Sequence, residues 1–240
     1  MHDTTRERLL AAWERELGAP ARPGTTAVEG PSGAAVVLVH AGSTRARVPA
    51  AWVPAASAAD AVSLLSPAWW KALPGPSVHV VGPSVLAVRD LWDDGPQPAL
   101  VEQVPPWRLG GLRREVGDAD WVASGLAGDD VELAFARFAE PVEPSPWAHR
   151  VTEAARRTVV SAAAVLTPWD GVPVDVGVLV DPAYRGHGHG LEVASAATRF
   201  AVTEHGLARW RCPESDAASV ALATRLGFEP VARVLVVTAS

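Results

Sequence analysis

The stretch that decides the fold runs from Val172 to Phe200 and reads VPVDVGVLVDPAYRGHGHGLEVASAATRF. Its first part, Val174 to Val180, is mostly β-branched and aliphatic and has no helical period. Such a run is typical of a largely buried strand. Asp181-Pro182 closes the run, because proline cannot donate a hydrogen bond to a continuing ladder. The stretch therefore predicts a buried strand with a marked end.

A glycine turn and a helix follow that strand. Gly186, Gly188 and Gly190 stand at alternate positions, where they let the backbone turn sharply and expose consecutive N–H groups. From Leu191 to about Thr203 the alanine content and the apolar spacing predict a helix, which Gly206 ends. Unsatisfied amides and the positive end of the helix dipole converge at such a turn. We therefore expect an anion site, most simply for a phosphate or pyrophosphate.

Two common phosphate-binding motifs match this turn poorly. A P-loop requires GxxxxGK[ST], and no Lys-Ser or Lys-Thr follows these glycines. A dinucleotide-binding fold requires GxGxxG, whereas the spacing here is GxGxG with Leu191 next. Neither motif identifies the ligand.

Two other segments carry a resemblance to a known family. Val180 to Gly190 resembles the acetyl-CoA signature of the GNAT superfamily of N-acetyltransferases, V-x-P-x-x-R-G-x-G-x-G/A, at every fixed position. Asp216 to Phe228 resembles the second GNAT motif, N-x-x-S-x-x-L-Y-x-x-L-G-F, with aspartate for asparagine and Ala223 for tyrosine. The two motifs are correctly ordered and spaced, so the chain is similar to this superfamily over about its last third.

The resemblance implies an α+β (mixed α/β) fold, with a twisted mixed sheet flanked by helices. We expect a GNAT-like acetyl-CoA-binding domain over residues 116–240 and an additional N-terminal α/β region over residues 1–115, which is a candidate for a degenerate related domain. The patterns predict helices at 4–17, 57–65, 118–126 and 216–226, and strands at 34–40, 77–81, 85–89, 131–138, 158–166, 207–212 and 231–238. Loops are expected at 19–32, 93–98 and 140–146, and the tight connection 167–171 makes a hairpin of the two strands beside it.

The resemblance implies that the chain binds acetyl-CoA as its cosubstrate, and the binding residues are carried over by their positions in the motifs. The residues assigned to its pyrophosphate are Arg185, Gly186, His187, Gly188, His189 and Gly190. The main chain of Val178, Leu179 and Val180 would pair with its pantetheine, and Ser219 would lie near the thiol end. His187 replaces a common lysine or arginine, so binding could depend on pH.

In this family a substrate amine attacks the thioester directly, which requires a base for the ammonium group and an acid for the thiolate. Asp175, on the strand before the glycine turn, is the candidate base. Ala223 stands where the usual tyrosine acid would be. Tyr184, which is the single tyrosine of the chain, is expected to face the wrong way to replace it. Cys212, the only cysteine, reads as a core residue.

Composition narrows the partners. A net charge of -6 argues against nucleic-acid binding, and no apolar run is long enough for a membrane span. The single cysteine excludes a disulfide framework and a multi-cysteine zinc site, and two histidines in a glycine turn lack the fixed geometry of a metal pair, so we expect no metal. These features predict a soluble, cytoplasmic protein, and the residue usage is typical of a GC-rich bacterial genome. The sequence leaves a homodimer open.

The sequence is compatible with three functions. The first is an N-acetyltransferase that acts on a small-molecule or peptide amine, the second a non-catalytic acyl-CoA-binding or sensing domain, and the third a transferase of longer acyl groups. An acidic middle segment reads as a solvated surface rather than as a rim that attracts amines. The acceptor is not named by any motif.

Overall fold

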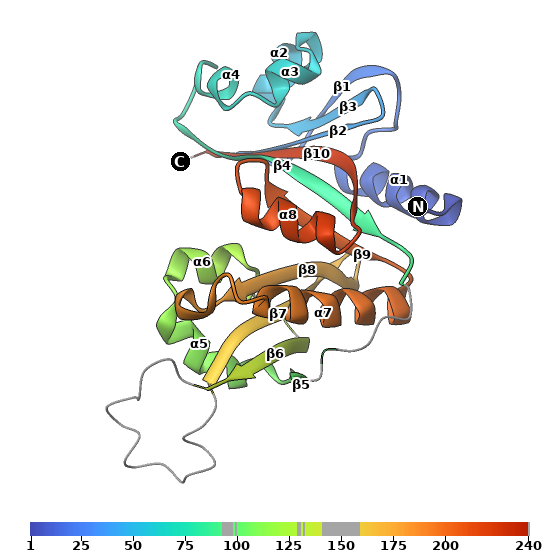
Figure 1. The fold of residues 1–240 in the computed structure, drawn as a ribbon. Coiled ribbons are helices and arrows are strands. Elements are labelled where there is room, and N and C mark those ends of the chain that lie inside the picture. The colour runs from blue at the N-terminus through green and yellow to red at the C-terminus, as the bar shows by residue number, and fades with distance from the viewer. Residues whose placement is uncertain (93–97, 99, 129–130, 132, 141–158, 240) are drawn as a thin grey trace. The chain divides into compact units, whose positions relative to one another are not determined.

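The computed structural model describes residues 1–92, 98, 100–128, 131, 133–140 and 159–239. The chain forms two compact units, one of residues 1–88 with 210–240 and the other of residues 89–209 (Figure 1). The glycine turn lies in the second unit.

The second unit is built on an antiparallel sheet whose strand order is β8-β7-β6-β5. Its strands are β5 (Val101–Val104), β6 (Leu133–Ala139), β7 (Val159–Trp169) and β8 (Val172–Val180). On its other edge β8 pairs in parallel with β9 (Ala208–Pro213) through Asp175 and Arg209. Within the described part of this unit, no strand pairs with that edge of β8 beyond Asp175.

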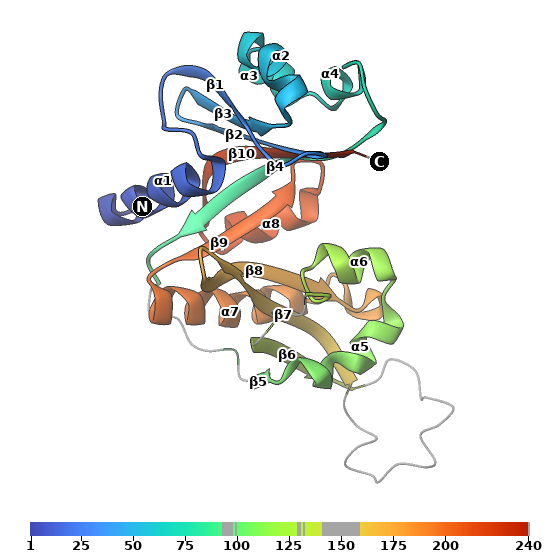
Figure 2. The same ribbon diagram turned by 180° about the vertical axis from the view of Figure 1, so that it is seen from behind.

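Helices cover both faces of this sheet. On one face lies α7 (His189–His205), which packs along β8, β7 and β6, and on the other face lie α5 (Gly110–Glu115) and α6 (Asp118–Ala123) (Figures 1 and 2). The short 3-10 segment η2 (Pro106–Leu109) leads into α5. Buried Leu109, Leu112 and Trp121 of these segments pack against alanines and valines of β6 and β7. The small residues of these strands thus let helices approach both faces closely.

The β7–β8 hairpin is tighter than we expected. The predicted connection 167–171 is wrong in extent, because β7 continues through Trp169 and only Asp170 and Gly171 form the turn. Both residues have positive φ, 53° and 75°. A two-residue turn of this kind matches the twist of the flanking strands, which explains why Asp-Gly is favoured there.

The first unit has a mixed sheet with the order β1-β3-β2-β10-β4. Its strands are β1 (Gly24–Glu29), β2 (Ala34–His40), β3 (Ser43–Val48), β4 (Val78–Arg89) and β10 (Glu229–Ala239). The loop predicted at 19–32 is wrong, because β1 pairs in parallel with β3 from Gly24 opposite Ser43 to Glu29 opposite Val48. The prediction of two strands at 77–81 and 85–89 is also wrong, since β4 runs continuously through Gly82.

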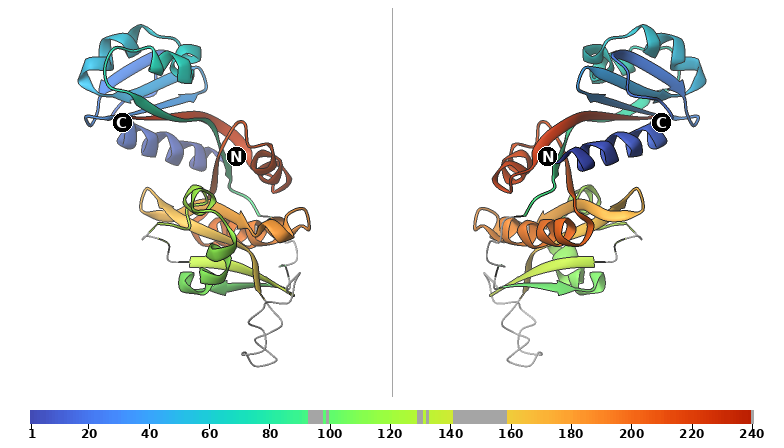
Figure 3. Two further views of the ribbon diagram at one scale, coloured as in Figure 1. Left: turned by 90° about the vertical axis from the view of Figure 1, so that its left-hand side faces the viewer. Right: turned by 90° about the vertical axis from the view of Figure 1, so that its right-hand side faces the viewer.

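Helices lie on both faces of the β1–β3 part of this sheet (Figure 3). One face is covered by α1 (Asp3–Leu17), and the other by α2 (Val53–Ala58), α3 (Ala61–Leu64) and α4 (Pro67–Lys71), with η1 (Ala50–Trp52) before them. The single helix predicted at 57–65 is wrong, because the chain is extended at Ala59 and Asp60. Asp60 caps α3 by accepting a hydrogen bond from the Ser63 amide at 2.8 Å, which favours a new helix start over a continuous helix.

The last helix, α8 (Ala217–Arg225), begins as expected at Asp216, whose side chain accepts from the Ser219 amide at 3.0 Å. The predicted mixed α/β class, with a mixed sheet flanked by helices, is confirmed. Residue 115 lies at the end of α5, inside the second unit. The division of the chain into domains at residue 115 stays a prediction. Apart from Pro98 and Glu140, the loops expected at 93–98 and 140–146 lie outside the described residues. No described helix is long and apolar enough to cross a membrane.

Candidate active site

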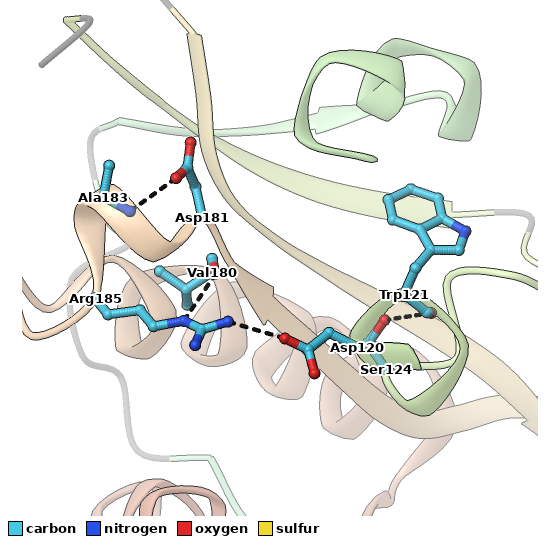
Figure 4. Close-up of polar contacts among 7 residues, drawn as sticks. All are labelled: Asp120, Trp121, Ser124, Val180, Asp181, Ala183 and Arg185. Carbon is cyan, nitrogen blue, oxygen red and sulfur yellow. Dashed lines mark hydrogen bonds and ion pairs between the residues drawn. The ribbon is translucent and has the colours of Figure 1, made fainter. Parts of the chain in front are cut away.

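The strand, turn and helix predicted from the sequence lie in direct succession. After β8 ends at Val180, Asp181 caps the short 3-10 segment η4 (Pro182–Tyr184) by accepting from the Ala183 amide at 2.9 Å (Figure 4). The Asp181 amide donates to the Ser161 carbonyl of β7 at 3.0 Å. Asp181 is buried. These bonds fix the direction in which the chain leaves the sheet and enters the glycine turn.

The glycine turn requires glycine at two positions by conformation and at a third by space. Gly186 and Gly188 have φ of 83° and 88°, in the region that side chains disfavour. A Cβ on Gly190 would lie 3.0 Å from Cγ2 of Val180, so the start of α7 sits tightly against the end of β8. Gly188 is the N-cap of α7 and has no side chain with which to cap it. The amides of His189 and Gly190, which precede the first backbone hydrogen bond of the helix at Leu191, therefore have no side-chain cap and suit an anion.

Arg185, the arginine of the motif, is held at the edge of this turn. Its Nη2 lies 3.1 Å from Oδ2 of Asp120, on α6, and its Nε donates to the Val180 carbonyl at 3.4 Å (Figure 4). Both side chains of the ion pair are 55% exposed. In α6 the Ser124 hydroxyl donates to the Trp121 carbonyl at 2.8 Å, which closes the last turn of the helix. Arg185 is thus oriented by α6 while it remains accessible.

The sequence alone does not indicate Asp120, because this residue is 65 positions away from Arg185 and lies in a generally acidic stretch. The motifs also leave out Arg137, on β6, whose Nε lies 2.6 Å from Oε2 of Glu192 in the first turn of α7. Only 12% of the Arg137 side chain is exposed. A signal was present, because Arg137 is the one charge in the apolar run LAFARFA. This ion pair anchors the start of α7 to the sheet.

The two histidines of the turn differ in environment. His187 is exposed, and its Nδ1 donates to the Arg185 carbonyl at 3.0 Å. The ring of His189 stacks on Tyr184 at 5.5 Å between centroids. Burial lowers the pKa of His189 below its ordinary value of 6.5; the charges of Arg137 and His187 lower it further, and the charge of Glu192 opposes this. His189 is therefore mostly neutral at pH 7.

Tyr184 is committed to the protein rather than to a ligand. Its side chain is buried, and its hydroxyl donates to the Glu140 carbonyl at 2.5 Å. That Tyr184 faces away from the reacting groups stays a prediction. Among the described residues, no group of three or more histidine, cysteine or acidic side chains is placed to hold a metal ion.

Asp175 is positioned by an arginine. Its Oδ1 lies 3.3 Å from Nε of Arg209, and 27% of the Asp175 side chain is exposed. Arg209 is buried, and its guanidinium lies 3.9 Å from the centroid of the Trp169 ring. Because the arginine is held against an aromatic face, it fixes the direction of the Asp175 carboxylate.

The middle of β8 is in close contact with the end of α6. A Cβ on Gly177 would lie 3.0 Å from the carbonyl carbon of Ser124, closer still to its oxygen, and 3.2 Å from Cγ2 of Val165. Only glycine permits this approach of the two backbones. α6 therefore contacts β8 at Gly177 and the glycine turn through the ion pair of Asp120 with Arg185.

The second motif lies in the first unit. Ser219, in α8, accepts a hydrogen bond from the Trp210 indole at 3.1 Å. Ala223, which replaces the tyrosine of the motif, is buried, and its carbonyl accepts from the Phe228 amide at 3.0 Å. Burial raises the pKa of the Cys212 thiol above its ordinary value, which agrees with a core residue rather than a nucleophile.

Comparisons with known proteins agree with the motifs. The family of the acetyltransferase (GNAT) domain matches residues 119–229. No curated protein matches the sequence. Among solved structures, a GNAT-family acetyltransferase from Colwellia psychrerythraea is similar, with 12% identity and a TM-score of 0.45 over 69% of this chain and 59% of that one. A putative GNAT acetyltransferase from Novosphingobium aromaticivorans has 17% identity and a TM-score of 0.41 over 70% of each chain.

A tandem GNAT protein from the clavulanic acid biosynthesis pathway has 20% identity and a TM-score of 0.42 over 72% of this chain and 58% of that one. The chain thus spans less than two thirds of the length of two of these three proteins. Residues 119–229 match the acetyltransferase (GNAT) domain family, whose members as a class transfer acyl groups. The match confirms, over somewhat less than half of the chain, the resemblance to the GNAT superfamily that the two motifs predicted.

Proposed function

We propose that the protein transfers an acetyl group from acetyl-CoA to a primary amine of a small molecule or peptide. The observation that carries this proposal is the glycine turn between β8 and α7, where amides without a side-chain cap and the motif arginine occur together at a helix N-terminus. This arrangement suits a pyrophosphate, because amide dipoles and a guanidinium both favour a doubly charged, oxygen-rich ligand.

The residues present fit acetyl-CoA along its length. The amides of Gly186, Gly188, His189 and Gly190, together with Arg185, would hold the pyrophosphate, whereas the His187 amide already donates to the Tyr184 carbonyl at 3.4 Å. The edge of β8 from Val178 to Val180 would offer main-chain groups to the two amides of the pantetheine arm, because within its own unit the described structure leaves that edge without a paired strand. A bound acetyl-CoA supplies the activated acyl group as a thioester.

The chain's own contribution to the reaction is proposed at Asp175. This carboxylate would take the proton of the incoming ammonium group, directly or through a water molecule, so that the amine can act as a nucleophile. Arg209, stacked on Trp169, would keep the carboxylate in one orientation. A base needs such a fixed position, because proton transfer requires hydrogen-bond distance from the substrate.

The source of the proton for the departing thiolate is proposed to be water. Ala223 has no acidic group, and the Tyr184 hydroxyl is bonded to the Glu140 carbonyl. The same two observations favour a second candidate function, a non-catalytic domain that binds or senses acyl-CoA. Use of longer acyl groups, a homodimeric state and a cytoplasmic location stay predictions.

We propose that the acidic residues of the middle segment form a solvated surface rather than a rim that attracts amines. Two of them already have cationic partners, since Asp118 lies 3.5 Å from Nη2 of Arg113 and Asp120 pairs with Arg185. Their charges are therefore partly neutralised within the protein itself.

An assay of thiol release separates transfer from binding alone. The purified chain is mixed with acetyl-CoA and a panel of small amines and amino-terminal peptides, and free CoA is measured with a thiol reagent. If the proposal holds, at least one amine accelerates release, and Asp175→Asn abolishes that release while acetyl-CoA still binds. Binding without release across the panel would support the sensing domain instead. Full turnover in Asp175→Asn would remove Asp175 from the proposed role.

A further inference from the structure

An arginine in the first unit has no part in the function proposed above. Arg45 lies in β3 and is fully buried, with 0% of its surface exposed. Its strand neighbours Ala46 and Val48 belong to the core on the side of α2, α3 and α4. Strand residues alternate between faces, and Ala46 lies on the other side, so Arg45 points toward α1. There its guanidinium lies 5.8 Å from the centroid of the Trp13 ring, and Trp13 is itself buried.

None of the three guanidinium nitrogens of Arg45 has a hydrogen-bond acceptor in the described part of the chain. Glu14 is exposed and acts on Arg45 only through space. Arg47, two residues further along the strand, shows the contrast, because its Nη1 donates to the Glu16 carbonyl at 2.9 Å. Arg45 therefore keeps its charge and five N–H donors away from water, and none of these donors has a hydrogen-bond acceptor among the described residues.

The polar groups named next to Arg45 are a hydroxyl and an imidazole, neither of which carries a negative charge. Ser43 lies on the same face of β3, and its hydroxyl is also buried and without a hydrogen-bond partner among the described residues. His40 lies opposite Ser43 in the β2–β3 ladder, and its Nδ1 is committed to the Val231 carbonyl at 2.6 Å. The Trp13 ring packs against the His40 ring, with 5.2 Å between the two ring centroids.

A buried charge without a partner is strongly unfavourable, so a folded protein normally supplies an opposite charge and hydrogen bonds to it. Arg45 and Ser43 together present a planar fork of donors and one hydroxyl. The chemistry that complements them is a small group with several negatively charged oxygen atoms. A cation or a neutral apolar molecule would leave every one of these donors without an acceptor.

We propose that Arg45 and Ser43 form a binding site for a small oxyanion, of the carboxylate or phosphate type, beneath α1. The guanidinium would hold two oxygens side by side, the Ser43 hydroxyl would donate to one of them, and Trp13 would shield the pair from water. Complete burial of Arg45 limits the ligand to a single anionic group. The anion exchanges when α1 opens locally, since terminal helices open at a lower free energy than the core of a unit.

The first test observes Arg45 directly in the full chain. The Nε–Hε resonances of ¹⁵N-labelled arginine are recorded while potassium phosphate, and in a second series sodium formate, is added at constant ionic strength. The Arg45 resonance is assigned by its loss in Arg45→Met. It should shift and saturate with phosphate, formate or both, while the Arg47 resonance does not move. An Arg45 resonance that both anions leave unchanged would overturn the proposal.

The second test uses stability, with Arg47→Met as the matched control on the same strand. Wild type and Arg47→Met should gain about 3–6 °C in Tm for each tenfold rise in phosphate above the Kd of the site. Arg45→Met should lack this gain, and in phosphate-free buffer it should be at least as stable as wild type, because an unpaired buried charge is gone. Phosphate bound at the glycine turn affects all three chains equally, so their difference reports Arg45 alone.

Two outcomes of the stability test would contradict the proposal. Parallel increases in Tm for all three chains would mean that Arg45 binds no anion. A constant loss of stability in Arg45→Met at every phosphate concentration would make the guanidinium a packing element against Trp13. If Arg45→Met does not fold, Ser43→Ala takes its place. That variant should shift the saturation of the Arg45 resonance to higher phosphate, and an unchanged saturation curve would count against the site.

Discussion

The contact between Gly177 and Ser124 leads to a quantitative prediction for Gly177→Ala. A methyl group at residue 177 would overlap the Ser124 carbonyl and crowd Cγ2 of Val165 at 3.2 Å. The overlapping group is backbone, so it cannot rotate away as a flexible side chain would, and either α6 or β8 has to shift. Forcing an extra methyl group into a packed site costs about 1–3 kcal/mol. For a chain of this length the loss corresponds to a Tm lowered by about 2–12 °C.

The matched control is Gly111→Ala, the same substitution in α5 of the same unit. A Cβ at Gly111 would have no neighbour within 4 Å, and the residue is helical. Alanine should therefore stabilise the chain by up to about 1 kcal/mol, because it reduces the freedom of the unfolded chain. Urea or thermal unfolding measures both variants. If Gly177→Ala proves as stable as Gly111→Ala, the described approach of α6 to β8 is wrong.

Three further predictions concern the site. Burial lowers the pKa of His189 below 6.5, so the unfolded chain takes up a proton at a higher pH than the folded chain does. The stability of the wild type should therefore fall as the pH decreases from about 6.5 toward 5.5. Urea midpoints of His189→Gln should fall less over this pH range, and an equal fall would contradict this cause. Asp120→Asn should tighten acetyl-CoA binding about twofold to fivefold, which is the range for an exposed ion pair, because Asp120 then no longer competes with the pyrophosphate for Arg185. Weaker binding of acetyl-CoA, measured by calorimetry, would refute this competition. Arg209→Met should lower the rate constant of thiol release with little change in the affinity for acetyl-CoA, because the contacts described for its guanidinium are to Asp175 and Trp169 rather than to the glycine turn. An unchanged rate would show that Asp175 needs no such support.

Local signals explain what the sequence predicted well. β8 and α7 lie next to each other in the chain, and their ends are set by Asp181-Pro182 and by Gly206, whose φ of 71° ends the helix. The cap of α8 is equally local, since Asp216 bonds an amide three residues later. These features depend on neighbouring residues, which a reader of the sequence can see together.

The missed features depend on partners that are distant in the chain. The sequence predicts a loop at the β1 segment because prolines and glycines flank it, and its partner β3 begins only with Ser43. Asp175 and Arg209 are 34 residues apart, and no pattern links them before the strands are aligned. β5 (Val101–Val104) is too short to show a period, although it pairs with β6. Such pairings are set by tertiary packing rather than by local propensity.

The central claim is that the glycine turn holds acetyl-CoA, and calorimetric titration of the purified chain tests it most directly. Gly188→Asn and Gly206→Asn form the matched pair. Both glycines have positive φ and open space around a Cβ, and Gly188 is the N-cap of α7 whereas Gly206 is its C-cap. We predict that wild type and Gly206→Asn bind acetyl-CoA and CoA but not NADH, and that Gly188→Asn loses CoA binding. Equal affinity in all three chains, or no binding of either CoA species by wild type, would contradict the account.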